Sequence, residues 1–227
     1  MQLKPFRIER YFAEHEFTAQ HLLSASDCES VALPDLLTLA DDEARGLWER
    51  LWLGYTDSAG HPLLRAEIAK LYALAADHAL VAAPEEAIFI AMNALLEAGD
   101  EVILTWPAYQ SLGEIARAIG CNVVHWPLRV ESGRWTLDPD DLPALLSPRT
   151  KLVIINFPHN PTGYLPTREA WDRIVATVAG RGITLFSDEM YRWLEYDEAQ
   201  TLPSACEVYE RAVTLGGVSK SLGLPGL

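Results

Sequence analysis

The sequence predicts an α/β protein with a mostly parallel sheet flanked by helices. Apolar segments with strand character alternate with segments of helical periodicity between about residues 84 and 215. Single helices separate successive strands, which implies right-handed crossovers between parallel strands. The 227 residues are 49% hydrophobic and 22% charged, a composition typical of a globular protein that can bury a sizeable core.

The first 45 residues differ in pattern from the rest. Residues 1–17 carry many charged and aromatic side chains, and an apolar run at 33–39 follows a loop-like stretch. We expect residues 1–45 to form an N-terminal arm that belongs to a small domain. Residues 46–227 are expected to form a large domain that is incomplete at its C-terminus, because the chain ends on a turn-like Gly-Leu-Pro-Gly-Leu segment.

Proline and glycine mark the bounds of several elements. Pro84 opens a helix with Gly99 just beyond its end, and Gly120 and Gly180 follow two further helices. The helix at 84–98 is apolar nearly all round, which predicts burial on both sides. The strands are expected at 101–105, 121–126, 151–157, 183–187 and 212–215, and the helices from residue 62 onward at 62–73, 84–98, 108–119, 138–146 and 167–179.

Charge and composition exclude several classes of function. The net charge of −14 argues against broad binding to nucleic acids or to anionic membranes. No stretch of about 18 residues is apolar enough to predict a membrane span. Cys28, Cys121 and Cys206 are widely spaced, and the histidines form no pair at metal-ligand spacing, so no metal site is expected. A reducing, cytoplasmic setting is the expectation.

Four chemically useful segments follow predicted strands, where open parallel sheets bind their ligands. These segments are 106–109, 160–163, 188–191 and 219–221. Together they supply an aromatic face, an amide, a carboxylate, a phenol and an amine. A site for pyridoxal phosphate (PLP) requires that set.

The chemistry of PLP assigns a role to each side chain. Lys220 is the candidate amine for a Schiff base with the cofactor aldehyde. Asp188 suits the pyridine nitrogen, which must stay protonated if the ring is to withdraw electrons. Asn160 and Tyr191 suit the phenolic oxygen, and Tyr109 suits stacking on the ring.

An ordered set of motifs extends over about residues 50–227. The motifs are Leu-Gly-Tyr-Thr at 53–56, Glu-Ala-Gly-Asp-Glu-Val-Ile at 97–103, Pro-Ala-Tyr at 107–109, Asn-Pro-Thr-Gly at 160–163, Ser-Asp-Glu-Met-Tyr at 187–191 and Ser-Lys-Ser at 219–221. In this order they resemble a C-terminally truncated fold-type I, PLP-dependent aminotransferase of class I/II, in the aspartate aminotransferase superfamily. The resemblance implies a PLP-binding large domain and amino transfer between an L-amino acid and a 2-oxo acid.

The resemblance also implies roles for individual residues. It implies that Lys220 binds PLP as a Schiff base and then moves the proton, assisted by Asp188 and Tyr191. It implies a cis peptide bond between Asn160 and Pro161. It places Tyr55 at the phosphate of a neighbouring subunit, so a homodimer with shared active sites is expected.

The predicted phosphate end of the site departs from the family pattern. The resemblance adds Ala83, Glu85 and Ser219 to the cofactor-binding residues, but Ala83-Pro84 stands where the family has Gly-Ala, and Pro84 has no N–H to donate. The N–H groups of Glu85 and Glu86 remain available if their carboxylates point away from the phosphate. Gly217 replaces a family serine, and the family's phosphate-binding arginine would fall at position 228.

These departures keep two alternatives open. One is a different PLP reaction on the same fold: β-elimination as in a C–S lyase, decarboxylation or amino-acid oxidation. The other is a non-catalytic module with this fold.

Overall fold

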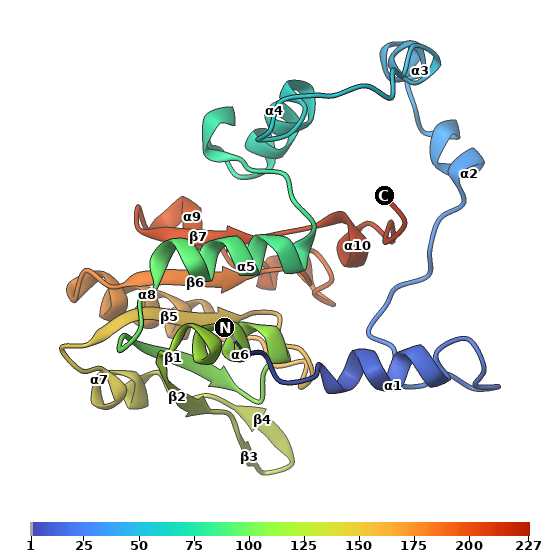
Figure 1. Ribbon diagram of the computed structural model, residues 1–227. Coiled ribbons are helices and arrows are strands. Elements are labelled where there is room, and N and C mark those ends of the chain that lie inside the picture. Colours follow the sequence, from blue (N-terminus) through green and yellow to red (C-terminus); the bar gives the residue numbers. More distant parts are fainter. Residues whose placement is uncertain (1) are drawn as a thin grey trace. The chain divides into compact units, whose positions relative to one another are not determined.

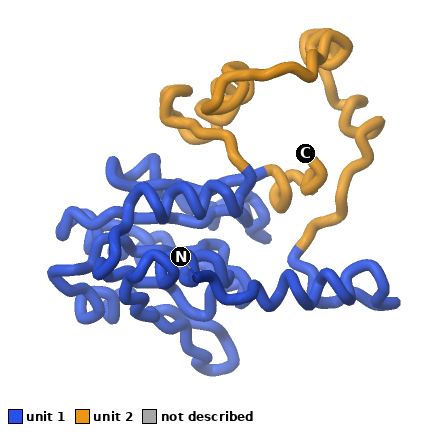
Figure 2. The backbone as a smooth tube through the Cα atoms, viewed as in Figure 1, with its two compact units in different colours: residues 1–26, 83–217 blue, residues 27–82, 218–227 orange. Residues whose placement is uncertain are grey.

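The computed structural model describes residues 2–227, and Figure 1 shows their helices and strands. The chain has two compact units. Residues 1–26 and 83–217 belong to unit 1, and residues 27–82 and 218–227 belong to unit 2 (Figure 2). The predicted domains 1–45 and 46–227 stay a prediction, and the two units divide the chain at other positions.

Unit 1 contains a parallel sheet of five strands in the order β2-β1-β5-β6-β7, which confirms the predicted fold class. Each strand lies within two residues of its predicted bounds. The strands are β1 (Glu101–Trp106), β2 (Asn122–Pro127), β5 (Thr150–Asn156), β6 (Thr184–Asp188) and β7 (Ala212–Leu215).

Helices pack on both faces of this sheet because side chains alternate along each strand. Leu152 and Ile154 of β5 share one core cluster with helices α5 (Pro84–Leu95) and α6 (Gln110–Ile119). Val153 and Ile155, one residue out of phase, share the other cluster with helix α8 (Arg168–Gly180). The sheet is therefore the middle of three layers.

Local signals fix the ends of the helices. The Thr167 hydroxyl accepts a hydrogen bond from the N–H of Ala170 and caps α8, and Gly120 ends α6 with a φ of 107°. The helix predicted at 138–146 is a 3₁₀ turn, η2 (Pro139–Asp141), followed by the short α7 (Leu142–Leu145). The remaining unit 1 elements are α1 (Arg7–His15), β3 (Arg129–Glu131), β4 (Arg134–Thr136), η3 (Glu198–Gln200) and α9 (Ala205–Val208).

The prediction that the helix at 84–98 is buried on both sides is wrong for α5 in the described residues. Ile88 and Met92 are buried against the sheet, whereas Phe89 and Ile90 are 43% and 41% exposed. The helix covers one face of the sheet, so only one of its own faces packs on the strands.

Unit 2 consists of short helices and connecting segments: α2 (Leu33–Thr38), α3 (Asp42–Glu49), α4 (Pro62–Leu71), η1 (Ala76–His78) and α10 (Val218–Ser221). The N–H of Val31 donates to the carbonyl of Gly223, which joins the two chain segments of the unit. Gly223 has a φ of +65°, and a Cβ there would lie 2.6 Å from the carbonyl oxygen of Glu29. Only glycine fits this approach.

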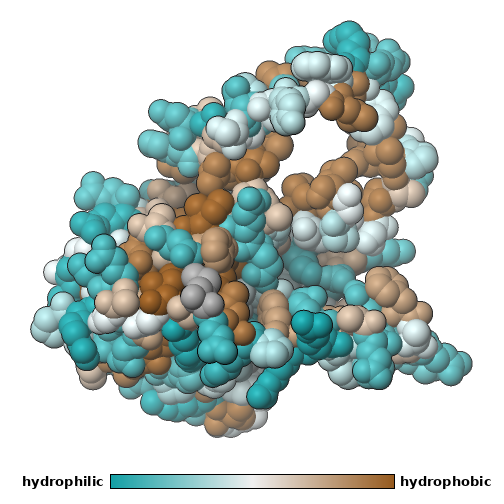
Figure 3. Space-filling view, in the orientation of Figure 1, coloured by the Kyte–Doolittle hydropathy of each residue, from teal (hydrophilic) through white to brown (hydrophobic). Residues whose placement is uncertain are grey.

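Much of the surface of unit 2 is apolar. Helices α2 and α3 line a cleft of about 500 Å³ with leucine and alanine side chains and Trp48. Trp52, Leu53 and Tyr55 lie in the connection to α4 and are exposed. Figure 3 shows hydrophobic side chains on the surface of this part of the chain. In residues 2–227 no helix has both the length and the hydropathy to cross a membrane.

Candidate cofactor site

Asn156 joins the two turns that carry Asn160 and Asp188. It is the last residue of β5 and is buried, opposite Asp188 in the strand register. Its Nδ2 donates to the carbonyl oxygen of Asp188 at 2.9 Å, and its Oδ1 accepts from the N–H of Asn160 at 2.7 Å. The motif analysis missed Asn156, although a polar residue that ends an apolar strand is a visible signal.

Asp188 presents a buried carboxyl group at the carboxyl end of β6. Burial, with the negative charges of Glu189 and Glu85, raises the pKa of Asp188 to about 7, although the N–H of Met190 donates to this carboxylate. A cationic ring nitrogen next to this group would reverse the shift. The environment of Asp188 therefore fits a pyridinium.

Asn160 lies in a turn that His159 and Thr162 hold in shape. The Asn160–Pro161 peptide bond is cis, as the resemblance implied. His159 Nδ1 lies 2.7 Å from the Thr162 hydroxyl, which accepts from the N–H of Tyr164. Burial lowers the pKa of His159 to about 4, so the ring is neutral near pH 7. His159 thus supports the turn and approaches the carbonyl of Pro107 in the next loop.

Tyr109 lies at the start of α6 and contacts the N-terminal segment of unit 1. Its ring meets Phe6 edge to face, with centroids 4.9 Å apart, and its hydroxyl donates to Glu9 at 3.2 Å. Burial, with the carboxylates of Glu85 and Glu9, raises the pKa of Tyr109. Tyr109 and Tyr191 both pack against the core cluster that includes α5 and α6.

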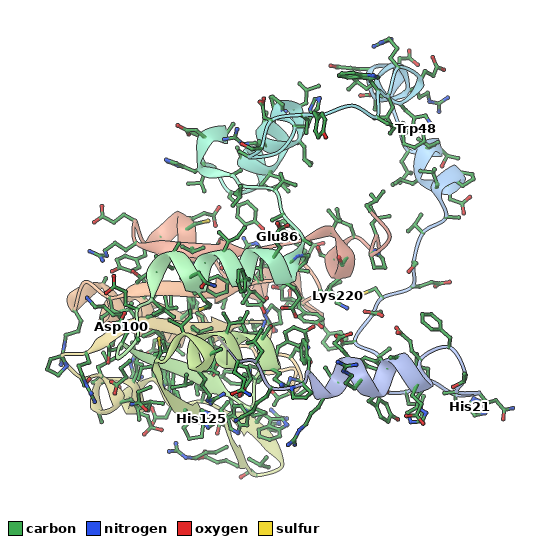
Figure 4. All side chains as sticks on the ribbon, in the orientation of Figure 1. His21, Trp48, Glu86, Asp100, His125 and Lys220 are labelled. Carbon is green, nitrogen blue, oxygen red and sulfur yellow. The ribbon has the colours of Figure 1, made fainter. Side chains whose placement is uncertain are left out.

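The start of α5 combines helix N–H groups with negative charge. Ala83 is the N-cap residue and Pro84 the first helical residue, so Glu85 and Glu86 supply the free N–H groups of the first turn. Figure 4 shows Glu86 at this end of the helix. The Glu85 carboxylate interacts with Tyr109 and with Asp188, so it faces the predicted site. Phosphate binding would require this carboxylate to point away.

Unit 2 carries the remaining predicted residues. Lys220, labelled in Figure 4, and Ser219 lie on α10. The Lys220 ammonium group pairs with the carboxylate of Asp27. Tyr55 is fully exposed in the connection between α3 and α4. The sequence analysis did not predict the Asp27 partner, because 193 residues separate Asp27 from Lys220.

The donor set fits PLP. Unit 1 contains a buried carboxyl group, an amide and two phenols, and unit 2 contains the Lys220 amine, which are the kinds of group that the cofactor requires. Within residues 2–227, no group of three or more potential metal ligands occurs.

Comparison with known proteins gives consistent matches. Residues 24–227 match the family described as aminotransferase class I and II. Capreomycidine synthase of Streptomyces vinaceus is 34% identical over 224 residues, which are 97% of this chain and 57% of that protein.

Several solved structures match the whole of this chain, and two of them illustrate the likeness. A PLP-dependent aminotransferase from Streptococcus suis has a TM-score of 0.89 and 29% identity, over 100% of this chain and 61% of that one. The PLP-dependent cyclase OrfR has a TM-score of 0.88 and 30% identity, over 100% of this chain and 59% of that one. The chain thus spans less than two thirds of the length of each of these proteins. It belongs to the class I and II aminotransferase family, and its cofactor is pyridoxal phosphate.

Proposed function

We propose that the protein transfers an amino group between an L-amino acid and a 2-oxo acid. The observation that carries this proposal is the buried carboxyl group of Asp188, which Asn156 ties to the turn of Asn160. The arrangement matches the needs of an electron-withdrawing pyridine ring, and family membership supports the reaction.

Each predicted site residue would have its own chemical role. PLP, when bound, supplies the electron sink for cleavage of a bond at the substrate Cα. Asp188 holds a proton at the pyridine nitrogen, and Asn160 and Tyr191 donate to the phenolic oxygen. Lys220 takes the proton from the substrate Cα and returns it one position away. The Lys220 amine must first leave its pairing with Asp27.

Initial-rate kinetics of the full-length protein test the proposal. With an L-amino acid and a 2-oxo acid varied together, we expect the parallel double-reciprocal lines of a ping-pong exchange. Ammonia release, or turnover that needs no acceptor acid, would contradict amino transfer.

A different PLP reaction is the second candidate, and two observations favour it. Capreomycidine synthase and the cyclase OrfR both match nearly the whole of this chain. In addition, Glu85 places a carboxylate at the predicted phosphate end of the site. If this candidate holds, the protein converts an amino acid to a product with no 2-oxo acid present, and no amino group appears on an added acceptor.

We also infer a homodimer with shared sites, in which Tyr55 reaches the phosphate bound by the partner. Full exposure of Tyr55 supports this role, as does the apolar cleft between α2 and α3. Mixing two inactive variants, Lys220→Ala and Tyr55→Ala, tests it. Each mixed dimer would have one site that keeps both residues, so activity returns. Stable dimers with no return of activity would contradict the shared site.

A cytoplasmic location is part of the same proposal. Cys28, Cys121 and Cys206 are all free thiols in the structure, which suits a reducing compartment. Fractionation of cells that express the full-length protein would test the location.

A further inference from the structure

A small cavity lies next to the turn that follows β6. Its volume is about 10 Å³, and its lining includes Trp171 of α8 and three residues of the turn region: Glu189, Arg192 and Glu195. Ser187 and several apolar side chains, among them Phe157, complete the lining. Five side chains with polar atoms therefore line one small cavity in unit 1.

All of these side chains except Ser187 have one buried polar atom with no hydrogen-bond partner among the described residues. The atoms are Trp171 Nε1, Arg192 Nε, Glu189 Oε2 and Glu195 Oε2. The first two carry hydrogen and are donors, whereas the carboxylate oxygens are acceptors. Leaving one such group unsatisfied costs about 1–3 kcal/mol, so four on one cavity indicate a ligand that satisfies them together.

Other polar atoms of Glu189 and Arg192 have partners in the protein. Glu189 Oε1 accepts from the N–H of Ala205 at 2.9 Å. Arg192 donates through Nη1 to the carbonyl of Leu202, and its Nη2 lies 3.8 Å from a carboxylate oxygen of Glu207. Arg192 Nη1 also lies 3.6 Å from Glu189 Oε2, an ion-pair distance that is too long for a hydrogen bond and leaves Oε2 able to accept one.

We propose that this cavity is a binding site for one water molecule. The water accepts hydrogen bonds from Trp171 and Arg192 and donates its two hydrogens to Glu189 and Glu195. The match is complete, because water offers two donors and two acceptors. The volume is about that of one water-sized sphere. A cation would meet the guanidinium of Arg192, and an anion would meet two carboxylates.

The water would connect α8 to the turn that carries two predicted cofactor-binding side chains. Glu189 directly follows Asp188, and Arg192 directly follows Tyr191. Trp171 lies in the first turn of α8, which Thr167 caps. The bridge therefore makes Trp171 a positioning residue for Asp188 and Tyr191. This second step rests on the proposed PLP function, whereas the water site itself does not.

A crystal structure of the full-length protein tests the water site. We expect one ordered water within hydrogen-bond distance of at least three of the four atoms. In Trp171→Phe, which removes one donor, the water should lose occupancy. Trp126→Phe is the matched control, because Trp126 is equally buried but donates to the carbonyl of Asp138. Direct pairing of the four atoms, or no density between them, would overturn the site.

Cofactor affinity tests the positioning role separately. By equilibrium binding of PLP, Trp171→Phe should bind severalfold more weakly than wild type, while Trp126→Phe stays close to wild type. Equal affinities of the two variants would overturn the positioning role and leave the crystallographic result to decide the water site. If neither variant nor wild type binds PLP, the proposed function fails and the water site still stands or falls by the crystal structure.

Discussion

The two units of the chain bury their large side chains to very different extents. In unit 1, Trp126 and Trp171 are at most 2% exposed within a three-layer core. In unit 2, Trp52, Leu53 and Tyr55 are 80%, 91% and 103% exposed. Exposed apolar surface of this kind marks a contact surface. Unit 1 thus completes its own core, whereas unit 2 presents side chains suited to another surface.

The predicted site residues show the same contrast. Buried Asn156 donates a hydrogen bond to the carbonyl of Asp188 and accepts one from the N–H of Asn160, which fixes both turns. Lys220 is held by one partly exposed ion pair with Asp27. A single ion pair of this kind contributes little to stability, so the amine is easily released. Buried hydrogen bonds thus hold the predicted unit 1 residues, whereas the role proposed for Lys220 requires it to exchange Asp27 for the cofactor.

The largest expected effect comes from replacing Lys220 in unit 2. Lys220→Ala should abolish turnover and the visible absorbance of protein-linked cofactor, because no other amine occupies that position. Absorbance spectra and initial rates of the full-length protein measure both. Lys70→Ala, which removes an exposed lysine paired with Glu67, should change neither. Retention of both signals by Lys220→Ala would show that the lysine is wrongly assigned.

In unit 1, Asp188→Asn should leave PLP bound but slow removal of the proton from the substrate Cα. We expect a loss of about 10³-fold or more, because an amide cannot hold the pyridine nitrogen protonated as a carboxylate does. Single-turnover kinetics measure the step. Asp172→Asn, on the exposed face of α8, is the matched control. A rate within tenfold of wild type would rule out the proposed role of Asp188.

Folding stability should also depend on pH through the buried carboxyl group of Asp188. The pKa of Asp188 is about 7 in the folded protein, and its ordinary value is 3.8. The contribution of this carboxyl group to folding stability is therefore fully present below pH 3.8 and is lost as the pH rises through 7. The stability of cofactor-free wild type relative to Asp188→Asn should therefore fall over that range, by about 4 kcal/mol at most.

Urea unfolding of the two proteins at several pH values measures this difference. Other shifted groups, such as His159, are common to both proteins and cancel in the comparison. A difference that does not change with pH would mean that the Asp188 carboxyl is not held in a desolvated environment.

A smaller effect is expected from replacing Asn156, which joins the turns of Asn160 and Asp188. Asn156→Ala removes a donor and an acceptor that are both buried and paired, which should cost about 1–3 kcal/mol of folding stability. Asn93→Ala is the control, since its amide donates only to the Phe89 carbonyl on an exposed helix surface. Equal unfolding midpoints for the two variants would contradict the bridging role.

Much of unit 1 could be predicted from the sequence because its signals are local. Apolar strands such as 151–157, followed by polar residues, predict both the sheet and the edge that carries Asp188 and Asn160. The β3–β4 hairpin was missed because its strands have three residues each, although Ser132-Gly133 gives the positive φ values of a tight turn.

The contacts that complete the site could not be predicted in this way. The pairing of Lys220 with Asp27 joins residues 193 positions apart, and the cavity beside Asp188 collects side chains from separate segments. The direction of the Glu85 carboxylate depends on Tyr109, which lies in a different helix. Such contacts follow from tertiary packing and leave no periodic signal in the sequence.

The attachment point of the cofactor decides whether Lys220 is the amine that binds it. The sequence contains four lysines, Lys4, Lys70, Lys151 and Lys220. Borohydride reduction of the PLP-loaded full-length protein makes any link between cofactor and amine permanent, and peptide mass spectrometry then locates it. We predict a pyridoxyl group on Lys220 alone among these four lysines. A pyridoxyl group on Lys4, Lys70 or Lys151 instead, or on none of the four, would show that Lys220 is not the amine that binds the cofactor.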